Sequence, residues 1–335
     1  NVRRSMQISE AETRAVTHGD GPAMVLAGPG SGKTLVITER VKYLIENLQV
    51  NPRNILVITF TKAAADEMRE RFIRLSGARG VTFGTFHAVF FGILKQAYHY
   101  TGDNILREEQ KFQILTDLIH RMKLEAQDEK ELAGELAGEI SIVKNEQIHL
   151  ENYYAKCCPE NAFREVYRGY EKALRARGLL DFDDMLTCTY ELFRLRPDIL
   201  QAWQRRFSHI LVDEFQDING LQYAVVRMLA APRDNLFIVG DDDQSIYRFR
   251  GAKPELMLNF PKDYPKARVI LLDKNFRSVS SIVKGALEVI GENKKRYPKE
   301  IVCSRGSGSG IDIRCFSNQD HESLYLVKQI RQSLA

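Results

Sequence analysis

Short apolar runs alternate with stretches of helical spacing in the first part of the chain. Residues 24–27, 55–59 and 81–83 are mostly apolar, which is typical of strands in a parallel sheet covered on both faces. Between these runs, apolar residues recur at helical intervals after Thr34, and residues 63–72 are rich in strong helix formers. This alternation predicts a doubly wound α/β sheet, whose ligands gather at the carboxyl ends of the strands.

The pattern changes between about residues 88 and 178. Helical spacing persists there and no strand is predicted, so we expect an all-helical insertion into the sheet domain. Its charged stretch, residues 123–146, favours a solvated helix face over a binding site. The sheet is expected to resume with the apolar runs at residues 209–212, 236–239 and 269–272.

The end of the chain has a different character. Residues 306–310 read Gly-Ser-Gly-Ser-Gly, a composition typical of a flexible linker. Residues 311–335 are predicted to form one strand followed by one helix.

A glycine-rich loop joins the first predicted strand to the first long helix. It consists of Ala27, Gly28, Pro29, Gly30, Ser31, Gly32, Lys33 and Thr34. Its three glycines are expected to adopt φ > 0 and to turn backbone N–H groups toward an anion, which the helix N-terminus also favours. Lys33 would add a charge for the outer phosphates, and the Thr34 hydroxyl suits Mg²⁺. Ala27 stands where the strict Walker A pattern has Gly, so an ordinary glycine-rich turn remains the alternative.

Polar residues follow the later strands directly. Asp213 and Glu214 come after one apolar run, Gln244 follows the next, and Arg277 lies shortly after the last. Asp213 could hold Mg²⁺ and Glu214 could deprotonate an attacking water. Gln244 and Arg277 could contact a γ-phosphate. Taken singly, the Asp-Glu pair is as well explained by a helix cap, and Gln244 and Arg277 by a solvated surface. The common position of these residues at strand ends favours a nucleotide hydrolase.

Composition limits the class of protein further. The 335 residues suggest two or three domains, and 44% hydrophobic with 27% charged residues is typical of a soluble globular protein. A net charge of +4 permits nucleic-acid binding without arguing for it. The five cysteines show no Cys-x-x-Cys spacing, which favours free thiols in a reducing cytosol. No apolar run approaches the length of a membrane span, so a cytoplasmic location without membrane contact is expected.

Several motifs together resemble those of UvrD/Rep-type superfamily 1 DNA helicases. The resemblance covers nearly the whole chain and is most specific at the Walker B motif, residues 211–217, and at motif III, residues 239–252. The other matching segments are residues 58–64, 84–87, 181–184 and 275–278. The resemblance implies a RecA-like P-loop NTPase sheet with an all-helical inserted subdomain. It also implies four segments: residues 1–107 and 179–272 as two parts of the first motor domain, 108–178 as the helical insertion, and 273–335 as the start of a second motor domain.

The resemblance also implies roles for individual residues, with ATP and Mg²⁺ as cofactors. The catalytic residues would be Lys33, Glu214, Gln244 and Arg277, and the metal ligands Thr34 and Asp213. The ATP site would consist of Ala27, Gly28, Pro29, Gly30, Ser31, Gly32, Lys33, Thr34, Phe276, Arg277 and Glu12, with Phe276 stacked on adenine. A single-strand channel would include Phe60, Thr61, His87, Tyr247, Phe249 and Arg250. For Phe83 and Phe86 we favour core packing.

Four positions depart from the family pattern. Glu12 stands where a Gln usually reads the adenine edge, and Leu35 stands where relatives often have Arg, so adenine selectivity is in doubt. Phe276 and Phe249 replace Tyr and Trp and would preserve stacking.

Beyond Ser278 no later family motif is found, including the second arginine finger. We therefore expect this chain to be part of a longer motor, with weak DNA binding, slow ATP turnover and no unwinding by itself.

The implied function is an ATP-dependent DNA helicase, with a place in DNA repair, that moves 3′ to 5′ on single-stranded DNA and acts on 3′-tailed duplexes. One alternative is a translocase that strips proteins from DNA without unwinding it. Another is an ATP-gated single-stranded nucleic-acid-binding module without unwinding activity.

Overall fold

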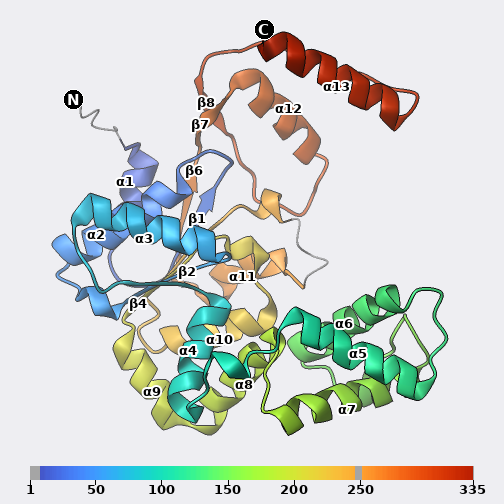
Figure 1. The fold of residues 1–335 in the computed structure, drawn as a ribbon. Coiled ribbons are helices and arrows are strands. Elements are labelled where there is room, and N and C mark those ends of the chain that lie inside the picture. The colour runs from blue at the N-terminus through green and yellow to red at the C-terminus, as the bar shows by residue number, and fades with distance from the viewer. Residues whose placement is uncertain (1–7, 246–250, 335) are drawn as a thin grey trace.

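The centre of the computed structural model, which describes residues 8–245 and 251–334, is a parallel sheet (Figure 1). In this part of the chain the sheet has six strands, in the order β3-β2-β4-β5-β1-β6. The strands are β1 (Ala23–Ala27), β2 (Ile55–Thr59), β3 (Thr82–Thr85), β4 (His209–Val212), β5 (Leu236–Gly240) and β6 (Arg268–Leu272). The predicted α/β fold is confirmed, and β1, β4 and β5 lie next to one another as a nucleotide site requires.

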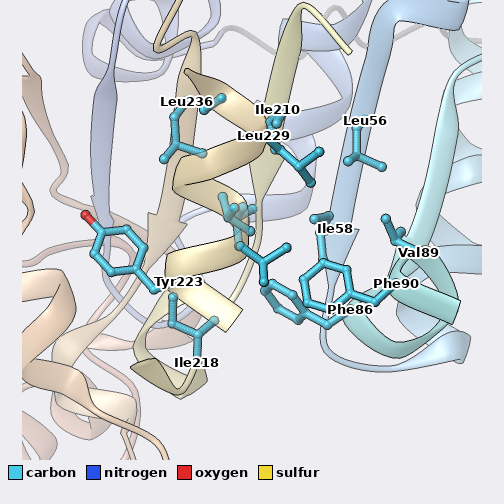
Figure 2. Packing of buried hydrophobic residues seen from close by; sticks show 14 of the residues in the cluster. Leu56, Ile58, Phe86, Val89, Phe90, Ile210, Ile218, Tyr223, Leu229 and Leu236 are labelled. Carbon is cyan, nitrogen blue, oxygen red and sulfur yellow. The ribbon is translucent and has the colours of Figure 1, made fainter. Parts of the chain in front are cut away.

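Side chains of each strand alternate between two hydrophobic cores, one on each face of the sheet. Met24 and Leu26 of β1 belong to one core, whereas Val25 and Ala27 belong to the other. Figure 2 shows the first core, where Leu56 and Ile58 of β2 lie near Phe86 and Phe90 of α4. Because both faces are covered, β1, β2, β4 and β5 are apolar apart from the terminal residues Thr59 and His209, which is the pattern that predicted them.

Helices cover both faces of the sheet. The first core is closed by α4 (Phe86–Tyr98), α8 (Phe182–Leu195), α9 (Pro197–Arg206), α10 (Gly220–Ala230) and α11 (Pro254–Asp263). The second core is closed by α1 (Glu10–Val16), α2 (Lys33–Glu46) and α3 (Lys62–Ser76). Short 3-10 helices are η1 (Pro52–Asn54), η2 (Gly102–Asn104), η3 (Leu150–Asn152), η4 (Phe215–Asp217) and η5 (Asp242–Gln244).

Three further helices form a separate cluster that projects to one side of the sheet, green in Figure 1. They are α5 (Glu108–Met122), α6 (Glu129–Asn145) and α7 (Glu160–Arg177), and they enclose a hydrophobic core of their own. The expected strand-free stretch is confirmed. In the charged stretch, residues 123–146, most charged side chains are exposed, as predicted, but Lys144 is buried.

The last part of the described chain forms a second, smaller sheet. Strands β7 (Lys274–Val279) and β8 (Val302–Arg305) pair in parallel, with α12 (Ser280–Ile290) between them in the sequence and α13 (Gln319–Leu334) after them. The strand predicted after residue 311 is wrong, because residues 311–316 have no regular secondary structure. Ile311 packs its side chain against Gly285 of α12, and Ile313 is 85% exposed. Strand β8, which carries few apolar residues, was not predicted.

Two expectations differ in detail from the structure. Strand β3 begins and ends later than predicted, so that Gly84 and Thr85 belong to the strand and His87 to the first turn of α4. The glycine-serine segment does not stand free, because the Ser280 and Ser281 N–H groups donate to carbonyl groups of Gly306 and Ser307. All five cysteines are free thiols, and no helix in the described ranges is long and apolar enough to cross a membrane.

Candidate nucleotide-binding site

The glycine-rich loop lies between β1 and α2, at the carboxyl end of the sheet. Gly30 and Gly32 have φ values of 66° and 83°, in the left-handed region that favours glycine. The expectation of φ > 0 at Gly28 is wrong. A Cβ atom there would lie 2.7 Å from Cδ1 of Ile301, so a larger residue at position 28 would have to displace the end of the isoleucine side chain.

The helix after the loop begins without a side-chain cap. Gly32 occupies the N-cap position of α2, and within the described part of the chain no side chain caps the first-turn N–H groups. Such uncapped N–H groups, together with the positive end of the helix dipole, form a binding site for an anion. The Ser31 hydroxyl of the same loop is buried without a hydrogen-bond partner among the described residues.

Two adjoining cavities contain most of the residues predicted to form the site. The loop cavity, of about 580 Å³, is lined by Ile8, Glu12, Gly30, Ser31, Gly32, Lys33, Thr34, Leu35, Glu67, Arg71, Glu214, Phe276 and Arg277. The carboxylate cavity, of about 360 Å³, is lined by Thr34, Thr59, Phe60, Thr61, Ala64, Glu67, Met68, Asp213, Glu214, Gln216, Asp217 and Gln244. Thr34, Glu67 and Glu214 line both cavities, so the structure brings the loop together with the acidic strand end.

Lys33 and Glu214 form an ion pair between the two cavities, with Nζ of the lysine 2.9 Å from Oε2 of the glutamate. Burial opposes ionisation of Glu214, but Lys33 and a hydrogen bond from Gln216 outweigh it and hold the pKa of Glu214 below its ordinary value. Glu214 occupies the N-cap position of η4, as the helix-cap alternative expects, but its side chain makes no capping hydrogen bond. Its backbone is left-handed, with φ of 49°, a strained conformation that is typical of functional sites.

Asp213 is buried at the end of β4. Burial, and secondarily the charge of Glu214, raises the pKa of Asp213 to about 7. Its Oδ1 atom accepts no hydrogen bond from the described residues. A buried carboxylate oxygen without a donor is costly unless a cation or another ligand compensates it, and Mg²⁺ prefers such hard oxygen ligands.

The residues present therefore fit a magnesium ion that is bound jointly by protein and nucleotide. Asp213 and Thr34 line the same cavity and both offer oxygen atoms. The described residues contain no group of three His, Cys, Asp or Glu side chains that could hold a metal ion alone. Mg²⁺ commonly uses one or two protein ligands plus substrate phosphates, which matches this donor set.

Gln216 links the acidic strand end to the next strand, a role that the sequence analysis missed. Its Nε2 donates to Oε2 of Glu214 at 2.8 Å, and its Oε1 accepts the backbone N–H of Asp241 at 3.0 Å. Asp241 in turn accepts Nε2 of Gln244 at 2.7 Å. A continuous polar chain thus runs from Lys33 to Gln244. The signal in the sequence was the glutamine immediately after the Asp-Glu-Phe segment.

Strand β7 lies directly against the glycine-rich loop. The Phe276 N–H donates to the Gly30 carbonyl at 3.0 Å, and Nδ2 of Asn275 donates to the Pro29 carbonyl. These bonds place the Phe276 side chain, which is 42% exposed, and Arg277 at the rim of the loop cavity. Both residues are therefore close to the loop, as the predicted ATP site requires.

Glu12 lines the loop cavity but also stabilises its own helix. Its Oε2 accepts the Ser9 N–H at 2.7 Å, and Ser9 accepts the Glu12 N–H, which together form a capping box. Its Oε1 lies 3.1 Å from the position that a Cβ atom would take at Gly32. Arg71 of α3 lines the same cavity and was not predicted; it lies one helical turn after Glu67.

The residues predicted to line a DNA channel are only partly brought together. Phe60 and Thr61 line the carboxylate cavity, and the Thr61 hydroxyl also caps α3 by accepting the Ala64 N–H at 3.1 Å. His87 lines neither cavity and lies edge-on to Phe182, with 5.2 Å between ring centroids. Burial lowers the pKa of His87.

Other predictions for aromatic residues have mixed outcomes. Phe83 and Phe86 are buried in the two cores, as predicted. Tyr247, Phe249 and Arg250 lie outside the described residues, so their predicted role rests on the sequence alone.

A parallel α/β sheet of this topology, with a glycine-rich loop after β1 and acidic residues after β4, defines a RecA-like P-loop NTPase. The sequence model of the UvrD/REP helicase N-terminal domain matches residues 8–265. The chain belongs to the UvrD/REP helicase family, and the resemblance inferred from its motifs is confirmed.

Similar proteins cover nearly all of the chain. YjcD of Bacillus subtilis (strain 168) is 39% identical over 342 residues, which is 98% of this chain and 44% of YjcD. ATP-dependent DNA helicases named PcrA are 36% identical in Leuconostoc citreum, over 97% of the chain and 44% of that protein, and 38% identical in Bacillus subtilis (strain 168), over 97% and 45%. The chain thus spans less than half the length of these relatives.

Proposed function

We propose that this chain binds and hydrolyses ATP with Mg²⁺ and couples hydrolysis to 3′-to-5′ movement on single-stranded DNA in a DNA helicase. Family membership and the PcrA helicases among its relatives support this assignment. The observation that carries the proposal is the polar chain from Lys33 through Glu214 and Gln216 to the end of β5. This chain of contacts joins three residues that follow β1, β4 and β5. They are Lys33, proposed to bind phosphate, Glu214, proposed as the general base, and Gln244, proposed to contact the γ-phosphate.

In this proposal the loop N–H groups and Lys33 bind the β- and γ-phosphates. Thr34 and Asp213 hold Mg²⁺, which when bound neutralises charge on the phosphates. A phosphate oxygen competes with Glu214 for Lys33, and the released carboxylate then accepts a proton from the attacking water. Its lowered pKa keeps Glu214 ionised for that role.

Two further residues stabilise the transferring phosphoryl group in the same proposal. Gln244 orients the γ-phosphate or the attacking water from the end of β5, and Arg277 neutralises charge that develops there. Phe276 stacks on the adenine at the rim of the loop cavity. The exposure of its ring is consistent with that role.

The proposal also divides the chain into domains. Residues 1–107 and 179–272 form the first motor domain, residues 108–178 a helical insertion, and residues 273–335 the start of a second motor domain. The separate core of the helical cluster and the second sheet are consistent with this division. The DNA substrates proposed are single strands and 3′-tailed duplexes, held by the aromatic and polar residues near the end of β2 and in motif III.

Hydrolysis is tested by comparing Glu214→Gln with the unmodified chain. We expect both proteins to bind Mg·ATP, and turnover to fall by a factor on the order of 10² or more in the variant, because the general base is lost. Glu70→Gln, on an exposed position of α3, is the control and should keep the original rate. Equal turnover in Glu214→Gln and the unmodified chain would contradict the proposal.

Direction of movement needs a separate measurement. A protein that includes this chain is loaded on single-stranded DNA blocked at one end by streptavidin. Movement from 3′ to 5′ predicts ATP-dependent displacement from the 5′ end. Displacement from the 3′ end alone would contradict the proposed direction, and displacement without duplex unwinding would indicate a translocase.

A further inference from the structure

Lys299 lies in the segment between α12 and β8, and its side chain is completely buried among three consecutive aspartates. Its Nζ atom is 2.6 Å from Oδ1 of Asp241, 2.5 Å from Oδ1 of Asp242 and 2.9 Å from Oδ2 of Asp243. These aspartates form the turn immediately after β5. We call Lys299 and the three aspartates the Lys299 cluster.

A second cation from the same segment reinforces the Lys299 cluster. Arg296 donates from Nε and Nη2 to the two carboxylate oxygens of Asp243, at 2.7 Å and 2.6 Å. The Tyr297 N–H donates to Oδ2 of Asp242 at 2.7 Å. Three carboxylates therefore face two cations and a backbone donor. Although burial opposes its charge, the carboxylates raise the pKa of Lys299, so the lysine stays ionised.

The cluster is directly connected to the nucleotide site through Asp241. While Oδ1 of Asp241 accepts Lys299, its Oδ2 accepts Nε2 of Gln244 at 2.7 Å. Gln244 lines the carboxylate cavity together with Glu214. One carboxylate thus lies between the buried lysine and the glutamine that faces the cavity.

The same segment also contacts the glycine-rich loop. Ile301, two residues after Lys299, has its Cδ1 atom 2.7 Å from the position that a Cβ would take at Gly28. The segment therefore touches both the phosphate loop and the turn that carries Gln244. It follows α12 and precedes β8, so it belongs to the part of the chain that holds the second sheet.

We propose that Lys299 is a positioning residue for hydrolysis: it fixes the Asp241 carboxylate, which in turn orients the Gln244 side chain toward the nucleotide. The role rests on the proposed ATPase function of the site. Asp241 also accepts the Asp243 N–H at 3.2 Å, so without Lys299 only this bond would hold its carboxylate. Gln244 would then have a less firmly fixed acceptor, and a misplaced contact group costs rate more than binding. Displacement of the α12–β8 segment would therefore change turnover through Lys299.

The alternative is that Lys299 only stabilises the fold. Removing one partner of a buried ion pair leaves uncompensated charge and destabilises a protein whatever its function. The two roles are separated by a double-mutant cycle, since residues that act through one another have non-additive effects. The cycle consists of Lys299→Met, Gln244→Ala and the double variant, with kcat and the Kd for Mg·ATP measured for each.

We expect Lys299→Met to lower kcat about tenfold while the Kd for Mg·ATP changes less than about threefold. In the Gln244→Ala background the same substitution should lower kcat less than about threefold, because the group that it positions is absent. Equal effects in both backgrounds, or an unchanged kcat in Lys299→Met, would overturn the positioning role. Lys299→Arg, which keeps the charge, should recover part of the lost rate.

Lys144 offers a matched control. It is also buried, and its Nζ lies 2.8 Å from Glu171, 2.8 Å from Asp181 and 2.7 Å from Asp184. None of these four residues lines the loop cavity or the carboxylate cavity. Lys144→Met should destabilise the fold comparably, yet leave kcat of the folded protein unchanged. An equal loss of kcat in Lys144→Met and Lys299→Met would show a general effect of destabilisation and overturn the proposal.

A milder variant covers the case in which Lys299→Met does not fold. The Arg296 side chain is 14% exposed, and Arg296→Gln leaves Lys299 in place. It should lower kcat about threefold, again only when Gln244 is present. No change in kcat would then overturn the proposal. If the unmodified chain itself neither binds nor hydrolyses ATP, the proposed function fails instead, so the two failures are distinguishable.

Discussion

Oε1 of Gln216 accepts the backbone N–H of Asp241 at 3.0 Å, so a single side chain joins the ends of β4 and β5. The same glutamine donates to Glu214, the residue proposed as the general base. Its position depends on the absence of a side chain at Gly240. A Cβ atom there would lie 2.6 Å from Oε1 of Gln216 and 3.0 Å from Sδ of Met257.

Gly240→Ala should therefore disturb both stability and catalysis. The added methyl group overpacks the contact, which we expect to lower the free energy of unfolding by about 1–3 kcal/mol. Because Gln216 must move, Glu214 loses a hydrogen bond, and ATP turnover should fall at temperatures where the variant is folded. Urea unfolding and a steady-state ATPase assay measure the two effects.

Gly134→Ala is the control for this substitution. Gly134 lies within α6, and a Cβ atom there would meet no atom within 4 Å. The change should stabilise the helix by about 0.5–1 kcal/mol and leave turnover unchanged. If Gly240→Ala behaved like Gly134→Ala, the inferred role of Gln216 would be wrong.

We propose that nucleotide selectivity depends on the carboxylate of Glu12, which lines the loop cavity. A carboxylate accepts hydrogen bonds but cannot donate one, whereas reading both polar atoms of the adenine edge requires a donor and an acceptor. We therefore expect ATP and GTP to compete for the site within about an order of magnitude, a weak discrimination of about 1.4 kcal/mol or less.

Glu12→Gln should increase the preference for ATP, because the amide adds a donor and keeps an acceptor for the Ser9 N–H. Glu10→Gln, whose side chain is exposed on the same helix, should not change the preference. The relative affinities for ATP and GTP are measured by competition with a fluorescent nucleotide. A strong adenine preference that survives Glu12→Ala would mean that another residue reads the base.

The raised pKa of Asp213 predicts how stability depends on pH. This pKa rises from an ordinary 3.8 to about 7, so between these pH values the folded protein holds a proton that the unfolded chain has released. The stabilisation is complete below pH about 4 and is lost as the pH rises through about 7.

Asp213→Asn removes this titration. The free energy of unfolding of the variant, relative to the unmodified chain, should increase by a few kcal/mol between pH 4 and 8, since each pKa unit corresponds to about 1.4 kcal/mol. Unfolding is measured without Mg²⁺ or nucleotide, with Asp103→Asn, at an exposed position, as the control. A pH-independent difference between Asp213→Asn and the unmodified chain would contradict this account of Asp213.

Phe60 provides a test of DNA binding within the described residues. We expect the chain to bind single-stranded DNA weakly, with an affinity that falls as salt increases because bound counterions are released. Phe60→Ala should weaken binding further, by about 1–3 kcal/mol if a base stacks on the ring. Phe112→Ala, an exposed aromatic position on α5, is the control in a fluorescence anisotropy titration. Equal losses in both variants would argue against a stacking role for Phe60.

The fold was largely predictable because its signals are local. Residues 55–59 and 209–212 are strands at the bounds expected, since a strand covered on both faces is apolar along most of its length. The glycine-rich loop was equally clear, because Lys33 is preceded by glycines and followed by a helix. Gly28 shows the limit of this reasoning, since its φ is not positive and its close contact is with Ile301, which is distant in the sequence.

Features that depend on distant contacts could not be predicted. Lys299 is an ordinary charged residue in the sequence, and only the fold places it against aspartates at positions 241–243. Likewise, β8 is a strand because β7 supplies a partner, whereas Ile311 and Ile313 alternate like a strand but pair with none among the described residues. The local sequence pattern sets the preference of a segment for helix or strand, and tertiary contacts decide whether that element forms.

In the proposed function, the loop ending in Lys33 is the phosphate site of an ATPase. Calorimetric titration of Mg·ATP into the unmodified chain, Lys33→Ala and Lys42→Ala tests it most directly. Lys42 lies on the same helix, pairs with Glu46 at 4.0 Å and lines neither cavity. We predict binding to the unmodified chain and to Lys42→Ala, and affinity at least about tenfold weaker in Lys33→Ala, because a charge-assisted contact to phosphate is lost. Equal affinity in all three proteins would contradict the account.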